Sequence, residues 1–169
     1  MATAFFRTQL GTYAAVHRDA RNKATHFIGI PVIIYSVLLA LTQWQFGVAG
    51  HHTSAAAVVA VLGVLGWMTL DVGIGLVMAV VMLMVWYAAE ALAGALGPTS
   101  TWIGFAALFV GGWALQFVGH HYEGKRPALL DNLFQAFVGP MFLVAEVLVV
   151  TGHRPDLATA VEQGDVTTL

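Results

Sequence analysis

The sequence predicts an all-α fold, a polytopic bundle of four to five transmembrane helices, on the basis of three observations. Of the 169 residues, 59% are hydrophobic and only 9% are charged, whereas soluble domains carry about 25% charged residues. Several apolar stretches reach the roughly 20 residues that a helix needs to cross the hydrocarbon layer. The Lys and Arg residues gather in segments that flank these stretches, as the positive-inside rule expects.

Composition also excludes several classes of site. The chain has no cysteine, which rules out disulfides, thiolate metal sites and cysteine nucleophiles. The net charge is -2, and no basic run alternates with aromatic residues, so no nucleic-acid partner is expected. No glycine-rich loop carries the lysine that a P-loop needs. The N-terminal 15 residues lack the continuous apolar core of a cleaved signal peptide.

The predicted spans follow from the apolar stretches. The first covers about Phe27–Phe46 and has Pro31 in its first turns, where a missing N–H costs least. The loop after it, Gly47–Thr53, has no formal charge. The stretch from Ser54 to Ala95 is long enough for two spans, and Asp71 marks the expected turn between them. A fourth span is predicted over about Thr101–Val118, followed by a polar segment from Gly119 to Asn132.

A fifth apolar stretch, about Leu133–Val150, leaves two interpretations open. It contains Gly139, Pro140 and Glu146, so it either spans the membrane or forms a broken helix packed against protein. We therefore take residues 1–150 as a single transmembrane domain. Residues 151–169 are expected to form a polar, frayed C-terminal tail.

The distribution of basic residues predicts the orientation of the bundle. Those before the first span are Arg7, Arg18, Arg21 and Lys23. Lys125 and Arg126 follow the fourth span, whereas the loops around His51 and Pro98 contain no Lys or Arg. Four crossings return the chain to the side on which it began. Both basic segments, and the turn at Asp71, are therefore expected at the cytoplasmic face.

Four of the seven histidines fall in these two basic segments: His17, His26, His120 and His121. Polar groups at the membrane boundary are tolerated only when they are paired or functional. With no cysteine available, a metal site would combine imidazole with carboxylate or water, which suits non-haem iron or zinc. The competing interpretation is an interfacial or solvated side chain, which we expect for the other three, His51, His52 and His153.

The spacing of these histidines constrains how they could meet. His17 and His26 are nine residues apart, which places them on roughly opposite sides of one straight helix. Both can reach one metal only if the chain bends near Asp19–Asn22 or if they belong to two separate helices.

Glu123 shares a helical face with Gln116 and His120, because these residues are three or four positions apart. We predict that Glu123 is either a metal ligand or a hydrogen-bonding partner of His120. The alternative is an interfacial ion pair with Lys125 or Arg126. Glu90 and Glu146 lie inside apolar stretches, where each is either paired with a polar neighbour or lines a pathway.

Two strings in this sequence carry a resemblance to a known family. The first is NKATHFIGIP, from Asn22 to Pro31, and the second is QFVGHHYEGKRPAL, from Gln116 to Leu129. With His17 upstream and Gly139–Phe142 downstream, they make the chain resemble the small membrane 2-hydroxy fatty acid dioxygenases. Fungal members of that family act in the alpha-oxidation of a sphingoid-base breakdown product, and bacteria carry relatives.

The resemblance implies an Fe(II)-dependent reaction with O₂ that shortens a 2-hydroxy fatty acid by one carbon. The family's motif histidines correspond to His17, His26 and His120, and His121 stands at a position that varies in the pattern. We keep all four as candidate metal ligands. Candidate catalytic residues are Glu123, Asn22 and Lys23. Lys23 contacts either the substrate carboxylate or lipid headgroups in this interpretation.

Two other classes of function stay open at this point. One is a different membrane metalloenzyme, such as a zinc hydrolase acting on a lipid. The other is a non-enzymatic transporter or scaffold, which would depend on Glu90 or Glu146 rather than on the histidines. The expected partners are a 2-hydroxy fatty acid, O₂ and membrane lipid. The expected location is the inner membrane of a bacterium, with the motif face and N-terminus in the cytoplasm. The sequence does not indicate the oligomeric state.

Overall fold

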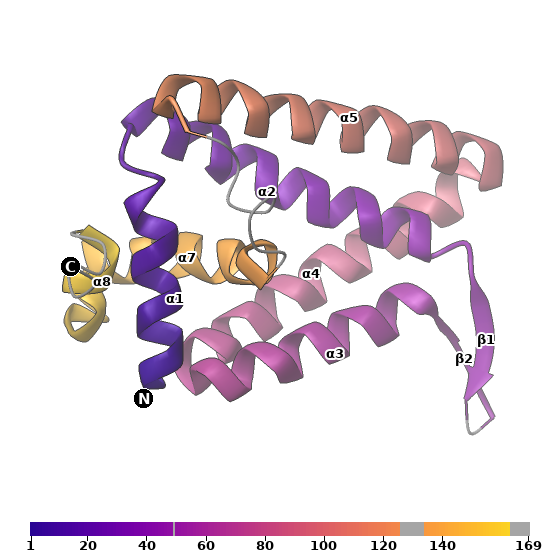
Figure 1. Cartoon of the computed structure of the whole chain (residues 1–169). Coiled ribbons are helices and arrows are strands. Elements are labelled where there is room, and N and C mark those ends of the chain that lie inside the picture. Colours follow the sequence, from indigo (N-terminus) through magenta and orange to yellow (C-terminus); the bar gives the residue numbers. More distant parts are fainter. Residues whose placement is uncertain (49, 126–133, 163–169) are drawn as a thin grey trace.

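The computed structural model describes residues 1–48, 50–125 and 134–162. The elements in chain order are α1 (Ala4–Ala15), α2 (Ala20–Leu41), β1 (Gln45–Val48), β2 (His51–Ser54), α3 (Ala55–Leu70), α4 (Val72–Leu96), α5 (Pro98–Glu123), α7 (Phe134–Val150), the 3₁₀ helix η1 (Pro155–Leu157) and α8 (Ala158–Glu162). Helices α2 to α5 run between the same two ends of the molecule, and α1 lies across one of those ends (Figure 1). The predicted all-α class is confirmed.

Three of the described helices, α2, α4 and α5, are long and apolar enough to cross a membrane. Helices α3 and α7 are also apolar but shorter, with 16 and 17 residues. Large apolar side chains such as Leu62, Leu83 and Ile103 point outward and are exposed, as lipid-facing residues are. The prediction of four to five spans stays a prediction.

Helix α2, which contains most of the first predicted span, begins and ends earlier than predicted. It starts at Ala20 because the Asp19 carboxylate accepts the Arg21 backbone N–H at 2.8 Å, which caps the helix N-terminus. The polar residues after Asp19 are therefore helical. As a consequence, Pro31 lies in the middle of α2 rather than in its first turns, and the Phe27 carbonyl loses its usual helical donor.

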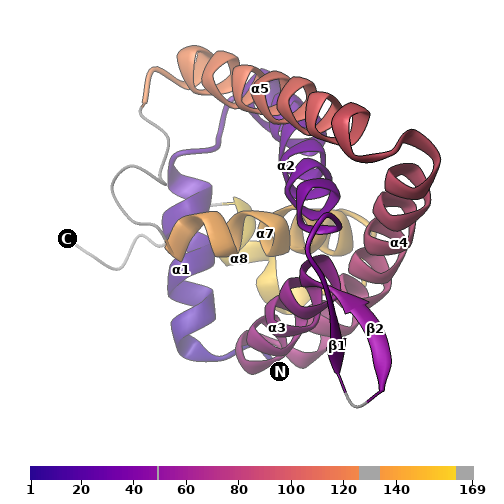
Figure 2. The same ribbon diagram turned by 90° about the vertical axis from the view of Figure 1, so that its right-hand side faces the viewer.

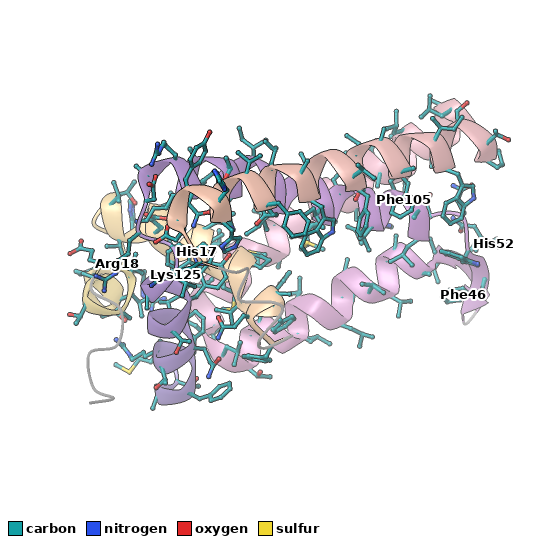
Figure 3. The ribbon with its side chains drawn as sticks, turned by 45° about the horizontal axis from the view of Figure 1, so that its top comes forward. His17, Arg18, Phe46, His52, Phe105 and Lys125 are labelled. Carbon is teal, nitrogen blue, oxygen red and sulfur yellow. The ribbon has the colours of Figure 1, made fainter. Side chains whose placement is uncertain are left out.

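The segment expected to be a loop after the first span is an antiparallel hairpin. Gln45 of β1 pairs with Ser54 of β2, and Val48 pairs with His51. The helix ends at Leu41, so the end of the predicted span, Trp44 to Phe46, belongs to this hairpin region. Phe46 and His52 lie at the opposite end of the molecule from His17 (Figure 3).

The predicted turn at Asp71 is confirmed. Its carboxylate accepts the Ile74 N–H at 2.8 Å and caps α4, while the Leu70 carbonyl accepts the N–H of Thr3 at 3.0 Å. This turn therefore lies at the end of the bundle that α1 covers. The fourth predicted span is part of the longer α5, which continues through His120 to Glu123 and ends at Gly124 with φ 66°.

Helix α7 covers the fifth apolar stretch as one continuous helix, and whether it spans the membrane stays a prediction. It lies between α1 and α4 (Figure 2), and eight of its residues, among them Gly139 and Pro140, are buried inside the protein. Its Phe137 carbonyl accepts the indole N–H of Trp67 at 2.9 Å. We therefore describe α7 as a helix packed within the bundle.

The expected frayed tail is wrong for its described part. Leu157 and Val161 are buried, and Arg154 donates two hydrogen bonds of 2.8 and 2.9 Å to the Asp71 carboxylate. Asp156 pairs with Arg7 of α1 at 2.9 Å. These contacts hold residues 154–162 against the end of the bundle that carries α1. Residues 163–169 of the predicted tail lie outside the described residues.

Candidate metal centre

Three of the four candidate histidines converge at the end of the bundle that α1 covers. His17 follows α1, His26 lies in the second turn of α2, and His120 lies in the last turn of α5. Each offers one ring nitrogen, and these atoms all lie within 4.8 Å of one another. The three side chains are 2%, 2% and 5% exposed. The break between α1 and α2 thus allows two histidines nine residues apart to face the same point.

Hydrogen bonds to the backbone orient two of these rings. His17 Nδ1 lies 2.7 Å from the Tyr13 carbonyl oxygen, and His26 Nδ1 lies 2.9 Å from that of Asn22. A carbonyl only accepts, so each Nδ1 carries the proton and each Nε2 carries a lone pair. The two Nε2 atoms are 3.1 Å apart. Two lone pairs at this distance repel each other unless a cation or a proton lies between them.

The remaining ring and the charge state also fit a metal. His120 Nδ1 is buried and has no hydrogen-bond partner in the described part of the chain. Burial lowers the pKa of His17 to about 3, against the smaller opposing effect of its bond to Tyr13. The imidazole is therefore neutral near pH 7. Neutral, backbone-oriented imidazoles that share one point are what a divalent metal requires of its ligands.

Close packing of α2 against α5 brings His26 near His120. These two helices form the most extensive helix pair among the described elements. Gly119 faces α2, and a Cβ added there would overlap Thr25 Oγ1 and lie 3.2 Å from His26 Nδ1. Small residues let membrane helices approach this closely. Gly119, beside His120 in the sequence, is therefore part of what builds the centre.

Glu123 fastens the connection between α1 and α2 to the end of α5. Its carboxylate accepts the backbone N–H groups of Arg18 and Asp19 at 3.0 and 2.9 Å. It also accepts the side-chain amide of Asn22 at 3.0 Å. His17 immediately precedes Arg18 and Asp19, whose N–H groups Glu123 binds. The carboxylate thus positions the segment that carries a histidine, a role that the sequence reasoning did not foresee.

Neither the predicted hydrogen bond from Glu123 to His120 nor the alternative ion pair with Lys125 is found in the described part of the chain. The orphaned Nδ1 of His120 means that this atom makes no hydrogen bond to Glu123. Lys125 instead donates to the Ala15 carbonyl at 2.9 Å. Arg126, the other candidate partner, lies outside the described residues.

Asn22 and Lys23 take different places. The Asn22 backbone carbonyl accepts a hydrogen bond from His26, and the Asn22 side-chain amide donates one to Glu123. Asn22 therefore supports the centre through these two hydrogen bonds. Lys23 forms a partly buried ion pair with Glu146 of α7 and does not line the cavity described below. The structure therefore brings Asn22 to the site and ties Lys23 to the packing of α7.

The other histidines lie apart from the three. His121 is exposed beside Tyr122, with ring centroids 6.2 Å apart, so the structure does not bring it into the cluster. His52 is exposed at the hairpin end (Figure 3). His153 is exposed as well and bonds to Thr151 at 3.0 Å. The solvated side chains expected for His52 and His153 are confirmed.

The three histidines line a cavity of about 120 Å³ with two kinds of wall. Its other polar residues are Tyr13, Gln116 and Gln135, and its apolar ones are Ile30, Ile33, Ile34, Trp113, Ala136, Gly139 and Pro140. A second cavity of about 250 Å³ lies between α2, α4 and α7 and is lined by apolar residues. Both cavities share Ile30, Ile34 and Pro140. An apolar cavity therefore adjoins the cavity that the histidines line.

Comparison with known proteins identifies the family of the chain. The family model described as 2-hydroxy-palmitic acid dioxygenase Mpo1-like matches residues 3–151, which include all three clustered histidines. The chain belongs to this family. The 2-hydroxy-palmitic acid dioxygenase MPO1 of Saccharomyces cerevisiae is 34% identical over 161 residues, covering 92% of this chain and 87% of the yeast protein. No solved structure matches the chain.

Two residues of this Mpo1-like site were not predicted from the sequence. Tyr13 stacks on His17, with parallel rings whose centroids are 3.9 Å apart. Gln135 is buried in α7 and lines the same cavity. Its position as an isolated amide in an apolar stretch was a usable signal, because buried polar groups in such stretches need a partner or a function. Tyr13 offered a weaker one, four residues before His17.

The two carboxylates inside apolar stretches of this Mpo1-like chain are both paired. Glu90 accepts the indole N–H of Trp86 at 3.0 Å and the hydroxyl of Ser54, and Glu146 pairs with Lys23. The polar-neighbour interpretation is confirmed for both. Because both carboxylates are paired, a transport pathway is not required to explain why they lie in apolar stretches.

Proposed function

We propose that this Mpo1-like protein is an Fe(II)-dependent dioxygenase that shortens a 2-hydroxy fatty acid by one carbon. The observation that carries the proposal is the convergence of three buried histidines beside an apolar cavity. The yeast relative is named for the oxygenation of 2-hydroxy-palmitic acid, which supports the substrate class. Family membership and the geometry of the cluster point to the same chemistry.

His17, His26 and His120 would hold the iron. Fe(II) bound by three imidazoles would supply open coordination positions for the acid and O₂, together with the redox chemistry of oxygenation. The chain's own part is to keep the ligands neutral and oriented. The Tyr13 and Asn22 carbonyls hold two of the protons at Nδ1, which leaves the opposite ring nitrogens free to bind.

The two adjoining cavities suit the two parts of a fatty acid. The polar head would lie beside the histidines, where Tyr13, Gln116 and Gln135 line the wall. The tail would lie in the apolar cavity between α2, α4 and α7. Because the surrounding helices are apolar outside as well, substrate could reach this space from the lipid bilayer.

The proposed reaction balances with O₂ as its only co-substrate: RCH(OH)COOH + O₂ → RCOOH + CO₂ + H₂O. The bond between C1 and C2 breaks, and C2 is oxidised from an alcohol to a carboxylic acid. O₂ accepts the electrons. No second reductant is required, so the chain needs no site for one.

Metal analysis combined with substitution tests this proposal. We expect the purified protein to hold iron and to shorten 2-hydroxypalmitic acid only when O₂ is present. His120→Ala should lose most of the metal and nearly all activity, because a missing ligand cannot be replaced inside a buried site. His153→Ala, at an exposed histidine, is the matched control and should keep both.

Three histidines also suit zinc, with water in the fourth position. Stoichiometric zinc together with turnover that does not need O₂ would replace the proposal with a zinc hydrolase. A His120→Ala variant that keeps its metal and its activity would remove that residue from the centre.

A further inference from the structure

We propose that Gln116 and Gln135 recognise the polar head of the substrate, and this inference rests on the proposed function. Gln116 would donate a hydrogen bond to the carboxylate, and Gln135 would accept one from the 2-hydroxyl group. The pair would thereby distinguish a 2-hydroxy fatty acid from the same acid without the hydroxyl.

Both glutamines carry a buried polar atom that has no partner. The side chains are 6% and 2% exposed. Within the described part of the chain, Gln116 Nε2 and Gln135 Oε1 make no hydrogen bond. A buried donor or acceptor without a partner costs free energy, and such atoms are rare unless a ligand or water meets them. Both residues line the cavity that contains the three histidines.

In the structure, Gln135 uses its amide nitrogen in a hydrogen bond and leaves its carbonyl oxygen without a partner. Its Nε2 donates to Gln9 Oε1 of α1 at 2.7 Å. The amide nitrogen is therefore occupied, and the carbonyl oxygen is the atom left without a partner. Gln135 thus presents an acceptor, which a carboxylate cannot use and a hydroxyl group can.

The surroundings of Gln116 place its amide close to the metal ligands. Gln116 lies four residues before His120 and on the same face of α5. Its amide lies against Gly29 of α2, where an added Cβ would overlap Nε2. The absence of a side chain at Gly29 therefore makes room for this amide between the two helices, one helical turn from His120.

The head of a 2-hydroxy acid has hydrogen-bonding needs that match this pair. Its carboxylate only accepts, and its hydroxyl group can donate. An unsubstituted fatty acid would satisfy Gln116 but would leave the Gln135 carbonyl unpaired in a buried site. Sites that hydrogen-bond a substrate hydroxyl reject analogues that lack it for this reason. A protein surrounded by lipid needs such discrimination.

Substitution by methionine tests the assignment, since methionine keeps the length and volume but removes the amide. Binding of 2-hydroxypalmitic acid and of palmitic acid to the metal-loaded protein would be measured by calorimetry in detergent. Gln135→Met should weaken binding of the hydroxy acid by roughly 5- to 10-fold and leave palmitic acid unchanged. Gln116→Met should weaken both acids by roughly 10-fold or more, because its partner is charged.

The controls separate this inference from the proposed function. Gln45→Met, at an exposed residue of the hairpin, should bind both acids as the wild type does, and all variants should keep their metal. Equal effects of Gln135→Met on the two acids, or none, would overturn the assignment while wild-type turnover keeps the proposed function. If Gln135→Met does not fold, Gln135→Asn should show the same selective loss, since it withdraws the carbonyl by one methylene. A wild type that neither binds nor converts either acid would overturn both.

Discussion

At the scale of single residues, the metal centre is organised by backbone groups. His17 and His26 each donate a hydrogen bond from Nδ1 to a carbonyl four residues earlier, so the local chain geometry decides which ring nitrogen is free to bind a metal. The Glu123 carboxylate accepts two backbone N–H groups between these histidines. Glu123 therefore acts on the candidate metal centre through the position of His17.

Glu123→Gln should weaken metal binding by roughly 10- to 100-fold, the range typical of groups that support ligands. Glutamine has the same length, but one of its two terminal atoms is an NH₂ group, which cannot accept the N–H groups of Arg18 or Asp19. Competition with a metal chelator measures the affinity. Asp19→Asn is the control. The Asp19 side chain caps α2 and pairs with Arg21 but makes no hydrogen bond to Glu123.

Wild-type metal affinity in Glu123→Gln would show that the hydrogen bonds of Glu123 to Arg18 and Asp19 are not needed to hold His17. Equal losses in Glu123→Gln and Asp19→Asn would point to the start of α2 in general and not to Glu123.

At the scale of elements, the centre exists because α2 and α5 touch along glycines. Gly119 meets Asn22, Thr25 and His26, so one face of α5 is shaped around the histidine-bearing turns of α2. The neighbouring pair Gly111 and Gly112 shows the contrast, since only Gly112 faces α2. Which face of α5 carries the small residues determines how near His120 comes to His26.

Gly119→Ala should separate α2 from α5 and lower both stability and metal affinity. Forcing an extra methyl group into a packed contact costs about 1–3 kcal/mol, and the displaced atoms include the ring of His26, a candidate metal ligand. Thermal unfolding and metal content in detergent are the measurements. Gly111→Ala is the matched control on the same helix, where an added Cβ meets nothing within 4 Å. Similar losses in both variants would mean that lipid contact, and not this close approach, is responsible.

Sequence reasoning predicted the parts of this fold that depend on local signals. The turn at Asp71 was predictable because a lone carboxylate interrupts an apolar stretch that is too long for one helix. The hairpin from Gln45 to Ser54 was missed because it lies next to the membrane spans and has weak alternation. The start of α2 was missed because the predicted span was drawn from the apolar stretch alone, which begins at Phe27, although aspartate at position 19 is a strong N-cap.

The site was predictable to the extent that its residues carry unusual chemistry. His17, His26 and His120 were selected because histidine binds metals and because these three lie near the ends of predicted spans. His120 and His121 could not be told apart by composition, because the rotation of about 100° per residue in α5 decides which one faces α2. The isolated amide of Gln135 in an apolar stretch marked the residue as unusual, but its place in the site depends on the packing of α7, which no local pattern encodes.

At the scale of the whole molecule, one end gathers the functional groups and much of the charge. Arg154 bonds to Asp71 and Asp156 bonds to Arg7, so the chain after α7 returns to the end that holds α1. Lys125 at the end of α5 and Arg21 at the start of α2 lie at that end too. The described residues from Thr42 to Ser54, at the opposite end, contain no Lys or Arg. The predicted orientation, with the histidines on the cytoplasmic side, rests on this asymmetry and stays a prediction.

Single cysteines would test the orientation, and the chain offers a clean background because it has none of its own. In intact bacterial cells, an impermeant thiol reagent should label His52→Cys in the hairpin. Arg21→Cys and Lys125→Cys should be labelled only after the membrane is opened, because the basic residues at their end favour the cytoplasm. The cysteine-free wild type is the control for background labelling. Labelling of Arg21→Cys and Lys125→Cys in intact cells, with His52→Cys labelled only after the membrane is opened, would contradict the orientation. It would not contradict the arrangement of the helices. Different accessibility of Arg21→Cys and Lys125→Cys would be the more serious result, since α2 and α5 must then carry their histidines on opposite sides of the membrane, where no common metal could join them.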